Sequence, residues 1–202
     1  MDSNKKTIIS QALEKGISYN QYVLLVKDLV AEKSTTGEEK TEALINYTLL
    51  NDRRLKRWNK TLKVSENQIE RLSNHSKKIT WLVLTESWCG DAAHVMPAIN
   101  KVVELNDAID LKVVLRDENI ELMDAFLTNG NQSIPKLIMI DSESEEVLNS
   151  YGPRPSDATK LVDDYKKKHG KLTPEFKEDL QKWYNKDKGQ NTVIDLLNLL
   201  DL

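Results

Sequence analysis

The sequence predicts an α/β fold, in which helices flank a central mixed sheet and further helices are added at both ends of the chain. Seven glycines and five prolines among 202 residues are few turn formers, which indicates a chain rich in helix. The run from Ile79 to Thr85 is nearly continuous in apolar and β-branched residues, as in a strand buried on both faces. We therefore divide the chain into an N-terminal helical extension (1–75), a sheet-bearing domain (76–170) and a C-terminal helical extension (171–202).

Three helix starts in the N-terminal extension are predicted by capping boxes. In such a box a Ser or Thr side chain and a Glu or Gln three residues later bond reciprocally to the backbone. The pairs are Ser18 with Gln21, Thr36 with Glu39, and Ser65 with Gln68. Apolar residues follow each pair at helical spacing, and packing explains them, so we place no chemistry in this part.

The middle part alternates between the two kinds of element. A helix with an apolar face follows residue 91, and another is predicted at Ile120–Leu127. Three further strands and a last helix are predicted at Leu111–Leu115, Leu137–Ile140, Val147–Tyr151 and Ser156–His169. The order β-α-β-α-β-β-α has a parallel first half and a hairpin second half, with right-handed crossovers that place helices over the sheet.

Two helices are expected in the C-terminal extension. Thr173 is a good N-cap, with Pro174 at the first helical position, and Asn191 is expected to cap the last helix. The apolar stripe of that helix (Val193, Leu196, Leu197, Leu200) either packs on the domain or meets a second copy. A homodimer through the terminal helices therefore stays open.

Composition excludes several classes of protein. A net charge of −3 argues against a nucleic-acid binder, which would normally carry a basic excess. The longest early apolar run, Val23–Val26, is too short for a signal peptide or a membrane span, so we expect a cytoplasmic protein without a membrane partner. The single cysteine, Cys89, rules out an internal disulfide and a cysteine-rich metal site within one chain.

Cys89 is the strongest candidate for chemistry. It lies between a buried strand and the start of a helix, at the strand ends where open α/β sheets bind ligands. The unpaired N–H groups and partial positive charge of a helix N-terminus favour a thiolate, and this effect lowers the pKa of a cysteine from its usual value of about 8.5. The polar turn formed by Gly90 and Asp91 predicts that the sulfur is accessible to solvent, and Trp88 would shield one side of it.

The segment Trp88–Ala92, with the sequence W-C-G-D-A, resembles the thioredoxin active-site sequence W-C-G-P-C at the matching strand-to-helix junction. Pro97 stands where thioredoxins kink the following helix, and Asp117 follows the second strand as in that family. Ile134–Pro135 matches the cis-proline that faces the cysteine, and Gly152 matches the glycine after the hairpin. The resemblance covers about residues 76–170 and implies a thioredoxin-like fold.

Two departures bear on function. Thioredoxins resolve the mixed disulfide with a second cysteine, but that position here is Ala92. Thioredoxins also hold a buried acid six residues before the attacking cysteine, and that position here is Val83. Asp91 replaces the family's proline, and its carboxylate opposes thiolate formation while suiting a helix start, so the sequence leaves the net direction of the Cys89 pKa shift open.

Other polar residues are weaker candidates. His94 is expected to lie beside Asp91 on the surface rather than on the sulfur. Arg116 and Arg154 sit near strand ends, where they either line the cleft or form ion pairs with Asp117 and other nearby acids. Glu86 is a possible site acid whose orientation nothing in the sequence determines.

The leading hypothesis is a monothiol thiol–disulfide exchange protein in which Cys89 attacks a protein or small-thiol disulfide. The resemblance implies that Pro135 shapes the cleft, that the Ile134 backbone pairs with an extended substrate, and that Trp88, Gly90 and Asp91 contact it. No cofactor is expected beyond an external thiol, which must release the mixed disulfide. The alternatives are a non-catalytic binding module on the same fold and a sensor whose thiol is reversibly oxidised.

Overall fold

A mixed four-stranded sheet forms the centre of the protein. The computed structural model describes residues 3–200. The strands β1 (Ile79–Thr85), β2 (Ile109–Leu115), β3 (Lys136–Asp141) and β4 (Val147–Tyr151) are hydrogen-bonded in the order β2-β1-β3-β4. β1 runs parallel to β2 and antiparallel to β3, and β4 completes an antiparallel hairpin with β3. The predicted α/β fold class, with a parallel first half and a hairpin second half, is confirmed.

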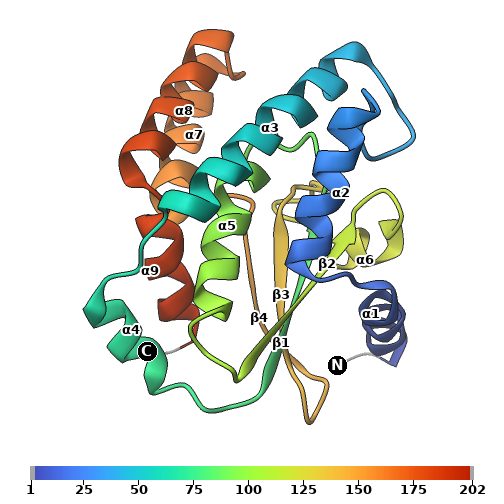
Figure 1. Ribbon diagram of the computed structural model, residues 1–202, viewed down its shortest axis with the longest axis vertical. Helices are drawn as coiled ribbons and strands as arrows, with labels where there is room; N and C mark the ends of the chain where they lie inside the picture. The colour runs from blue at the N-terminus through green and yellow to red at the C-terminus, as the bar shows by residue number, and fades with distance from the viewer. Residues whose placement is uncertain (1–2, 201–202) are drawn as a thin grey trace.

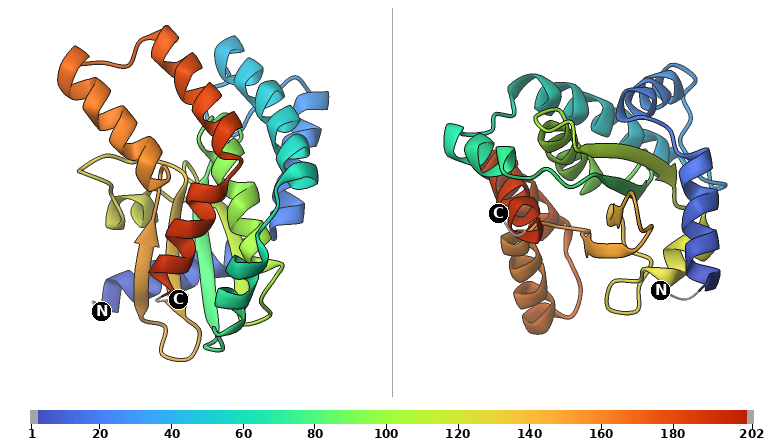
Figure 2. Two further views of the ribbon diagram at one scale, coloured as in Figure 1. Left: turned by 90° about the vertical axis from the view of Figure 1, so that its left-hand side faces the viewer. Right: turned by 90° about the horizontal axis from the view of Figure 1, so that it is seen from below.

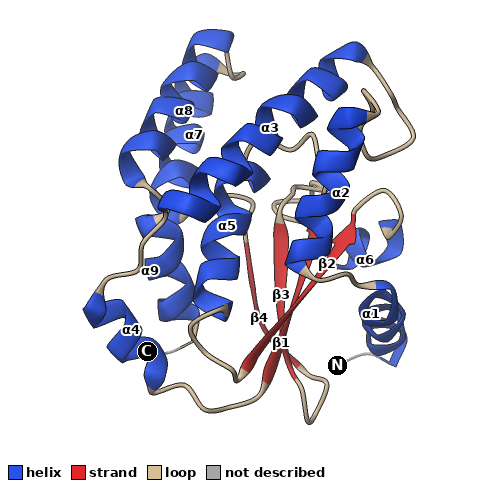
Figure 3. Ribbon diagram, viewed as in Figure 1, coloured by secondary structure: helices blue, strands red, loops and turns tan. Residues whose placement is uncertain are grey.

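Helices cover the sheet on both sides (Figures 1 and 3). In chain order they are α1 (Ser3–Lys15), α2 (Tyr19–Ala31), α3 (Glu42–Thr61), α4 (Glu66–Ser73), α5 (Ala92–Val103), α6 (Ile120–Ala125), α7 (Ser156–His169), α8 (Pro174–Asp187) and α9 (Gln190–Leu199). Seen from below in Figure 2, α1 and α6 lie on one side of the sheet, and α5 and α9 on the other. None of these helices is long and apolar enough to cross a membrane.

One hydrophobic core joins the sheet to both extensions. Strand β1 is buried almost throughout, as its β-branched run predicts. The same core takes in Tyr22 and Leu55 from the N-terminal helices and Val193 and Leu197 from α9. The apolar stripe of α9 therefore packs inside this chain and is not a free surface for a second copy.

Helix starts are partly as predicted. The capping boxes at Ser18 and Ser65 are formed, and Thr173 caps α8. The box predicted at Thr36 is wrong, because α3 begins later and is capped by Thr41, while the Thr36 side chain bonds to Ser87. The cap predicted at Asn191 is also wrong, since Gly189 precedes α9 and Asn191 lies inside it.

Candidate active site

Cys89 lies in the turn between β1 and α5. Its thiol donates a hydrogen bond to the Ile134 carbonyl at 3.3 Å, and the Ala92 N–H points at the sulfur from 3.5 Å. The structure therefore places Cys89 at a helix start and against the Ile134–Pro135 segment, as expected. The expectation of an accessible thiol is wrong, however, because the residue is only 7% exposed. Gly90 and Asp91, the polar turn after it, are half-buried, and helices of the two extensions line the hollow around them.

The pKa of Cys89, whose direction of shift the sequence left open, is raised. Burial raises it from its ordinary value to about 12, and the charge of Asp91 acts in the same direction. The N–H groups of Ala92 and Asp91 at the helix start lower it, as does Arg154, but they do not offset the loss of water. The resting thiol is therefore protonated at neutral pH.

Asp91 connects the cysteine turn to two distant parts of the chain. Its carboxylate forms an ion pair with Arg154 at 2.7 Å and accepts a hydrogen bond from the Tyr184 hydroxyl at 2.9 Å. Burial raises the pKa of Asp91, and both partners act against that rise because they stabilise the charged form. Of the two alternatives for Arg154, lining the cleft or pairing with a nearby acid, the structure shows the ion pair.

The residue before Trp88 is held by the N-terminal extension, where the sequence suggested no chemistry. Asn51 on α3 donates to the Ser87 carbonyl at 2.9 Å, and Thr48 Oγ1 lies 2.9 Å from Ser87 Oγ. The Ser87 N–H donates to Thr36 Oγ1 at 2.9 Å. These groups are buried, where hydrogen bonds are costly to break, so they fix the turn that carries Cys89.

His94 is buried, which corrects the expectation of a surface histidine. Its Nδ1 accepts from Trp58 Nε1 at 2.8 Å, and its Nε2 lies 3.1 Å from Gln181 Oε1. Because Nδ1 accepts, the proton is assigned to Nε2, which donates to Gln181. The ring stacks on Tyr184 with centroids 4.2 Å apart, and burial lowers the pKa of His94 to about 3. His94 is a neutral packing residue that joins α3, α5 and α8.

Ile134 and Pro135 close the site on the side of β3. The peptide bonds Ile134–Pro135 and Gly152–Pro153 are cis. Gly152 has a φ of +106°, and a Cβ there would lie 2.1 Å from the Pro135 carbonyl oxygen. The glycine that matches the thioredoxin pattern is therefore required by a close backbone contact.

Glu86, the possible site acid, directly follows β1, three residues before Cys89, and is fully buried. Its Oε1 accepts a hydrogen bond from the Asp117 N–H at 2.9 Å, and burial raises its pKa. Nothing in this arrangement directs the carboxyl at the sulfur, so we assign it a structural role.

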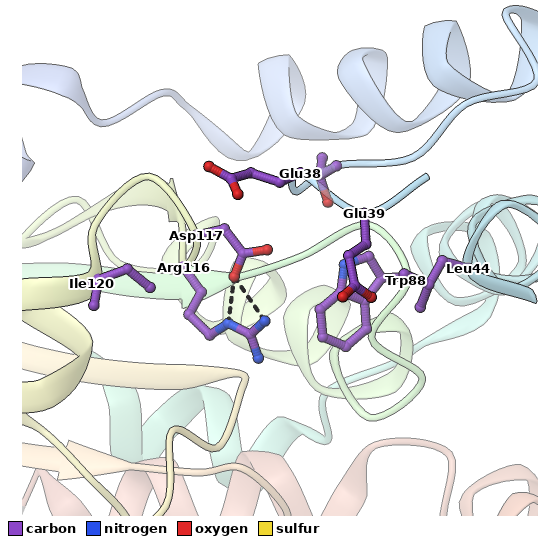
Figure 4. A pocket seen from close by; sticks show the side chains of 8 residues that line it. Glu38, Glu39, Leu44, Trp88, Arg116, Asp117 and Ile120 are labelled. Carbon is purple, nitrogen blue, oxygen red and sulfur yellow. Dashed lines mark hydrogen bonds and ion pairs between the residues drawn. The ribbon is translucent and has the colours of Figure 1, made fainter. Parts of the chain in front are cut away.

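Trp88 lies in the walls of two hollows on the surface. The first, of about 490 Å³, contains Glu38 and Glu39 from the loop before α3, and Arg116 with Asp117 after β2 (Figure 4). Arg116 binds Asp117 at 2.7 Å and stacks on Trp88 with its guanidinium 4.9 Å from the ring centroid. The ion-pair alternative for Arg116 is therefore also the one found, and this hollow does not contain the sulfur.

The second hollow contains Cys89. Its volume is about 430 Å³, and Trp88, Gly90 and Asp91 lie in its wall beside the cysteine. His94 on α5 and Arg154 before α7 also line it. The rest of the wall comes from the extensions: Leu44, Tyr47 and Arg54 on α3, and Leu172, Lys177, Leu180, Gln181 and Tyr184 on and before α8. In Figure 1, α3 and α8 lie at the end of the molecule where β2 ends.

The sequence did not predict that residues of the two extensions line the Cys89 cavity. Arg54 and Tyr184 both lie on helices whose apolar stripes predict only packing. The sequence does not show which site a charged residue on an amphipathic helix faces. Helical periodicity predicts which face of the helix is buried, but not which residues that face contacts. Within residues 3–200, no group of three or more His, Cys, Asp or Glu is arranged to hold a metal ion.

The fold and this site define a thioredoxin-fold protein with one cysteine at the strand-to-helix junction. A family model described as Thioredoxin matches residues 37–166, so the chain belongs to the thioredoxin family. The match includes α3, which is part of the N-terminal extension.

Solved structures share the whole architecture. A protein of unknown function from Pseudomonas aeruginosa is 16% identical, with a TM-score of 0.66 over 95% of this chain and 96% of that chain. An HIV epitope-scaffold is 14% identical, with a TM-score of 0.62 over the same shares of the two chains. These likenesses show the fold, including the added helices. No curated protein matches this chain.

Proposed function

We propose that this protein is a monothiol thiol–disulfide exchange protein in which Cys89 is the attacking residue. The observation that carries the proposal is the position of its sulfur. It lies at the start of α5, 3.3 Å from the Ile134 carbonyl oxygen and in the wall of a cavity of about 430 Å³. A disulfide that enters this cavity meets the thiol between Trp88, Gly90, Asp91 and the Ile134–Pro135 segment.

The exchange proceeds in two steps. The Cys89 thiolate attacks one sulfur of the substrate, forms a mixed disulfide and releases the other sulfur as a thiolate. Ala92 carries no thiol, and no acid stands at Val83, so the chain holds no internal resolving group. An external thiol attacks the mixed disulfide and restores Cys89. This step needs no cofactor other than that thiol.

The raised pKa of Cys89 limits the rate of the first step, the attack on the substrate disulfide. Only the thiolate attacks a disulfide, and burial keeps the resting thiol protonated at neutral pH. Exchange is therefore expected to be slow near pH 7 and to accelerate as the pH rises. A substrate that places positive charge or a hydrogen-bond donor near the sulfur would also favour the thiolate.

A second candidate is a non-catalytic binding module, in which the cavity holds a ligand and Cys89 is a packing residue. The burial of Cys89 and its raised pKa favour this candidate. It predicts a thiol that no disulfide modifies under native conditions.

Intact-mass measurement after incubation with glutathione disulfide separates the two candidates. The exchange proposal expects one added glutathione on the folded protein, removal by dithiothreitol, and no addition to Cys89→Ser. The rate should rise with pH. A folded wild-type protein that stays unmodified at alkaline pH, yet is modified once urea unfolds it, contradicts exchange and supports the binding module.

A further inference from the structure

Access to Cys89 from solvent is through a groove between the helices α3 and α8. A further hollow of about 500 Å³ adjoins the Cys89 cavity and shares four of its wall residues, Tyr47 and Arg54 on α3 and Lys177 and Gln181 on α8. The shared wall makes the two hollows neighbours in one groove between α3 and α8. A substrate therefore approaches the sulfur along this groove.

Two cations in the groove form no ion pair with a carboxylate of residues 3–200, although Glu178 also lies in its wall and the charge of Asp91 acts on Arg54. Arg54 donates to the Asn51 side-chain oxygen at 3.1 Å and forms no ion pair with a carboxylate of the described residues. It lies next to the cysteine turn, because its Nη1 is 3.6 Å from the position a Cβ would take on Gly90. Lys177 forms no ion pair with the described chain either, whereas Arg154 is paired with Asp91.

An extended peptide fits this site poorly. The Ile134 carbonyl already accepts the Cys89 thiol, and Ile134 is only 7% exposed, so its backbone is not open to a substrate strand. The helices on either side leave a groove that suits a small molecule. Ligand cavities of roughly 300–1,000 Å³ are the usual size for such molecules.

Resting on the proposed function, we propose that the substrate is a low-molecular-weight disulfide that carries a carboxylate, and that Arg54 and Lys177 bind this carboxylate. A guanidinium matches a carboxylate with two parallel hydrogen bonds, which gives both affinity and orientation. The disulfide is then held with one sulfur toward Cys89.

The substrate disulfide is itself the oxidant of Cys89, so the reaction needs no other electron acceptor. Cys89 loses its proton to water in the groove, and its thiolate forms a bond to the nearer substrate sulfur as the S–S bond of the substrate breaks. The departing sulfur leaves with the electron pair and takes up a proton. Cys89 is thereby oxidised to a mixed disulfide, and one half of the substrate is reduced to a carboxylate-bearing thiol.

Three disulfides of similar size and different charge test this specificity. They are dithiodipropionate (anionic), bis-hydroxyethyl disulfide (neutral) and cystamine (cationic). The rate of Cys89 modification is measured by intact mass, and each rate is divided by the rate of the same disulfide with a free thiol in solution. We expect dithiodipropionate to react fastest and cystamine slowest. Arg54→Gln should lower the dithiodipropionate rate about tenfold and leave the neutral rate unchanged.

Arg53→Gln is the matched control, because it removes the same charge from an exposed position on α3 outside the groove. Lys177→Gln changes an exposed side chain and is the second variant if Arg54→Gln impairs folding. It should also lower the dithiodipropionate rate and leave the neutral rate unchanged. Equal normalised rates for the three disulfides, or equal effects of Arg54→Gln and Arg53→Gln, overturn the carboxylate specificity alone. Failure of all three to modify the folded protein overturns both this inference and the exchange function.

Discussion

The carboxylate of Asp91 and the guanidinium of Arg154 form an ion pair of 2.7 Å whose side chains are 15% and 23% exposed. Asp91 lies two residues after Cys89, and Arg154 lies three residues after the end of β4, so the pair closes one side of the cysteine site. Because Asp91 bears its charge close to the sulfur, this pair also influences the thiol that it encloses.

Asp91→Asn is expected to speed the alkylation of Cys89. Removing the carboxylate charge eliminates one of the two causes that raise the pKa of the thiol, so the thiolate fraction at a given pH increases. A rate increase on the order of threefold corresponds to about half a pKa unit. Iodoacetamide labelling followed by mass spectrometry measures it. Asp163→Asn, an exposed carboxylate on α7, is the control, and a slower rate for Asp91→Asn would contradict this electrostatic account.

The alkylation rate of the wild-type protein should climb throughout the alkaline range. With a pKa raised to about 12, the thiolate fraction increases about tenfold for each pH unit below that value. The labelling rate at pH values from about 7 to 10 gives the profile, and a cysteine-containing unstructured peptide gives the reference, which levels off above about pH 8.5. A plateau of the protein below the plateau of the peptide would show a depressed pKa and contradict the effect of burial.

His94 should make the folded state sensitive to acid. Its pKa is lowered to about 3 when folded, so below about pH 6.5 the unfolded chain binds a proton that the folded chain does not. Stability is therefore full above pH 6.5 and falls as the pH drops toward 3. The loss from this group between about pH 7 and pH 5 is about 2 kcal/mol.

Urea unfolding at several pH values measures this loss. His94→Gln lowers stability at neutral pH, because the Trp58 and Gln181 hydrogen bonds and the stacking on Tyr184 are disturbed. It should nevertheless show a shallower fall between pH 7 and pH 5 than the wild type. Equal falls in the two proteins would mean that His94 is not the group responsible.

Ala92→Cys should give the protein measurable reductase activity toward a small disulfide such as bis-hydroxyethyl disulfide. The second thiol restores the C-x-x-C spacing that allows intramolecular attack on the mixed disulfide, and the Ala92 N–H already lies at the Cys89 sulfur. The wild type should be a poor catalyst with dithiothreitol as reductant. Val83→Asp, added to Ala92→Cys, supplies an acid for the second thiol, but its burial costs several kcal/mol, so folding must be verified first.

Turnover of bis-hydroxyethyl disulfide by the three proteins at equal concentration is the measurement. If folded Ala92→Cys gains no activity and its two cysteines do not form a disulfide, the site is not arranged for exchange. The binding-module candidate would then take first place.

Gly152→Ala is expected to destabilise the fold far more than Gly130→Ala. Both glycines have positive φ, so each substitution strains the backbone. A Cβ on Gly152 would also meet the Pro135 carbonyl oxygen at 2.1 Å, whereas one on Gly130 meets nothing within 4 Å. We expect a cost of about 1 kcal/mol at Gly130 and of about 3 kcal/mol or more at Gly152. Similar urea midpoints for the two variants would contradict the close contact.

The place of Cys89 in the chain could be predicted from sequence, but its environment could not. The run Ile79–Thr85 and the W-C-G-D-A segment locate the sulfur at a strand-to-helix junction, and the structure has it there. Its predicted exposure is wrong, and the sequence left the direction of its pKa shift open. Each depends on which side chains exclude water from the turn, and those come from α3 and α8, far away in sequence.

By itself the sequence determined the order of the elements, the strand β1, two of three capping boxes and the absence of an internal resolving thiol, because each of these follows from local spacing or from residue identity. Only the tertiary structure decided that Ser87 is held by Asn51, that Asp91 pairs with Arg154, and that His94 is buried. Residues far apart in the chain make these contacts, and amphipathic periodicity tells which face of a helix is buried without telling which residues it meets. The charge and burial around Cys89 are consequently properties of the packed helices, which local sequence does not encode.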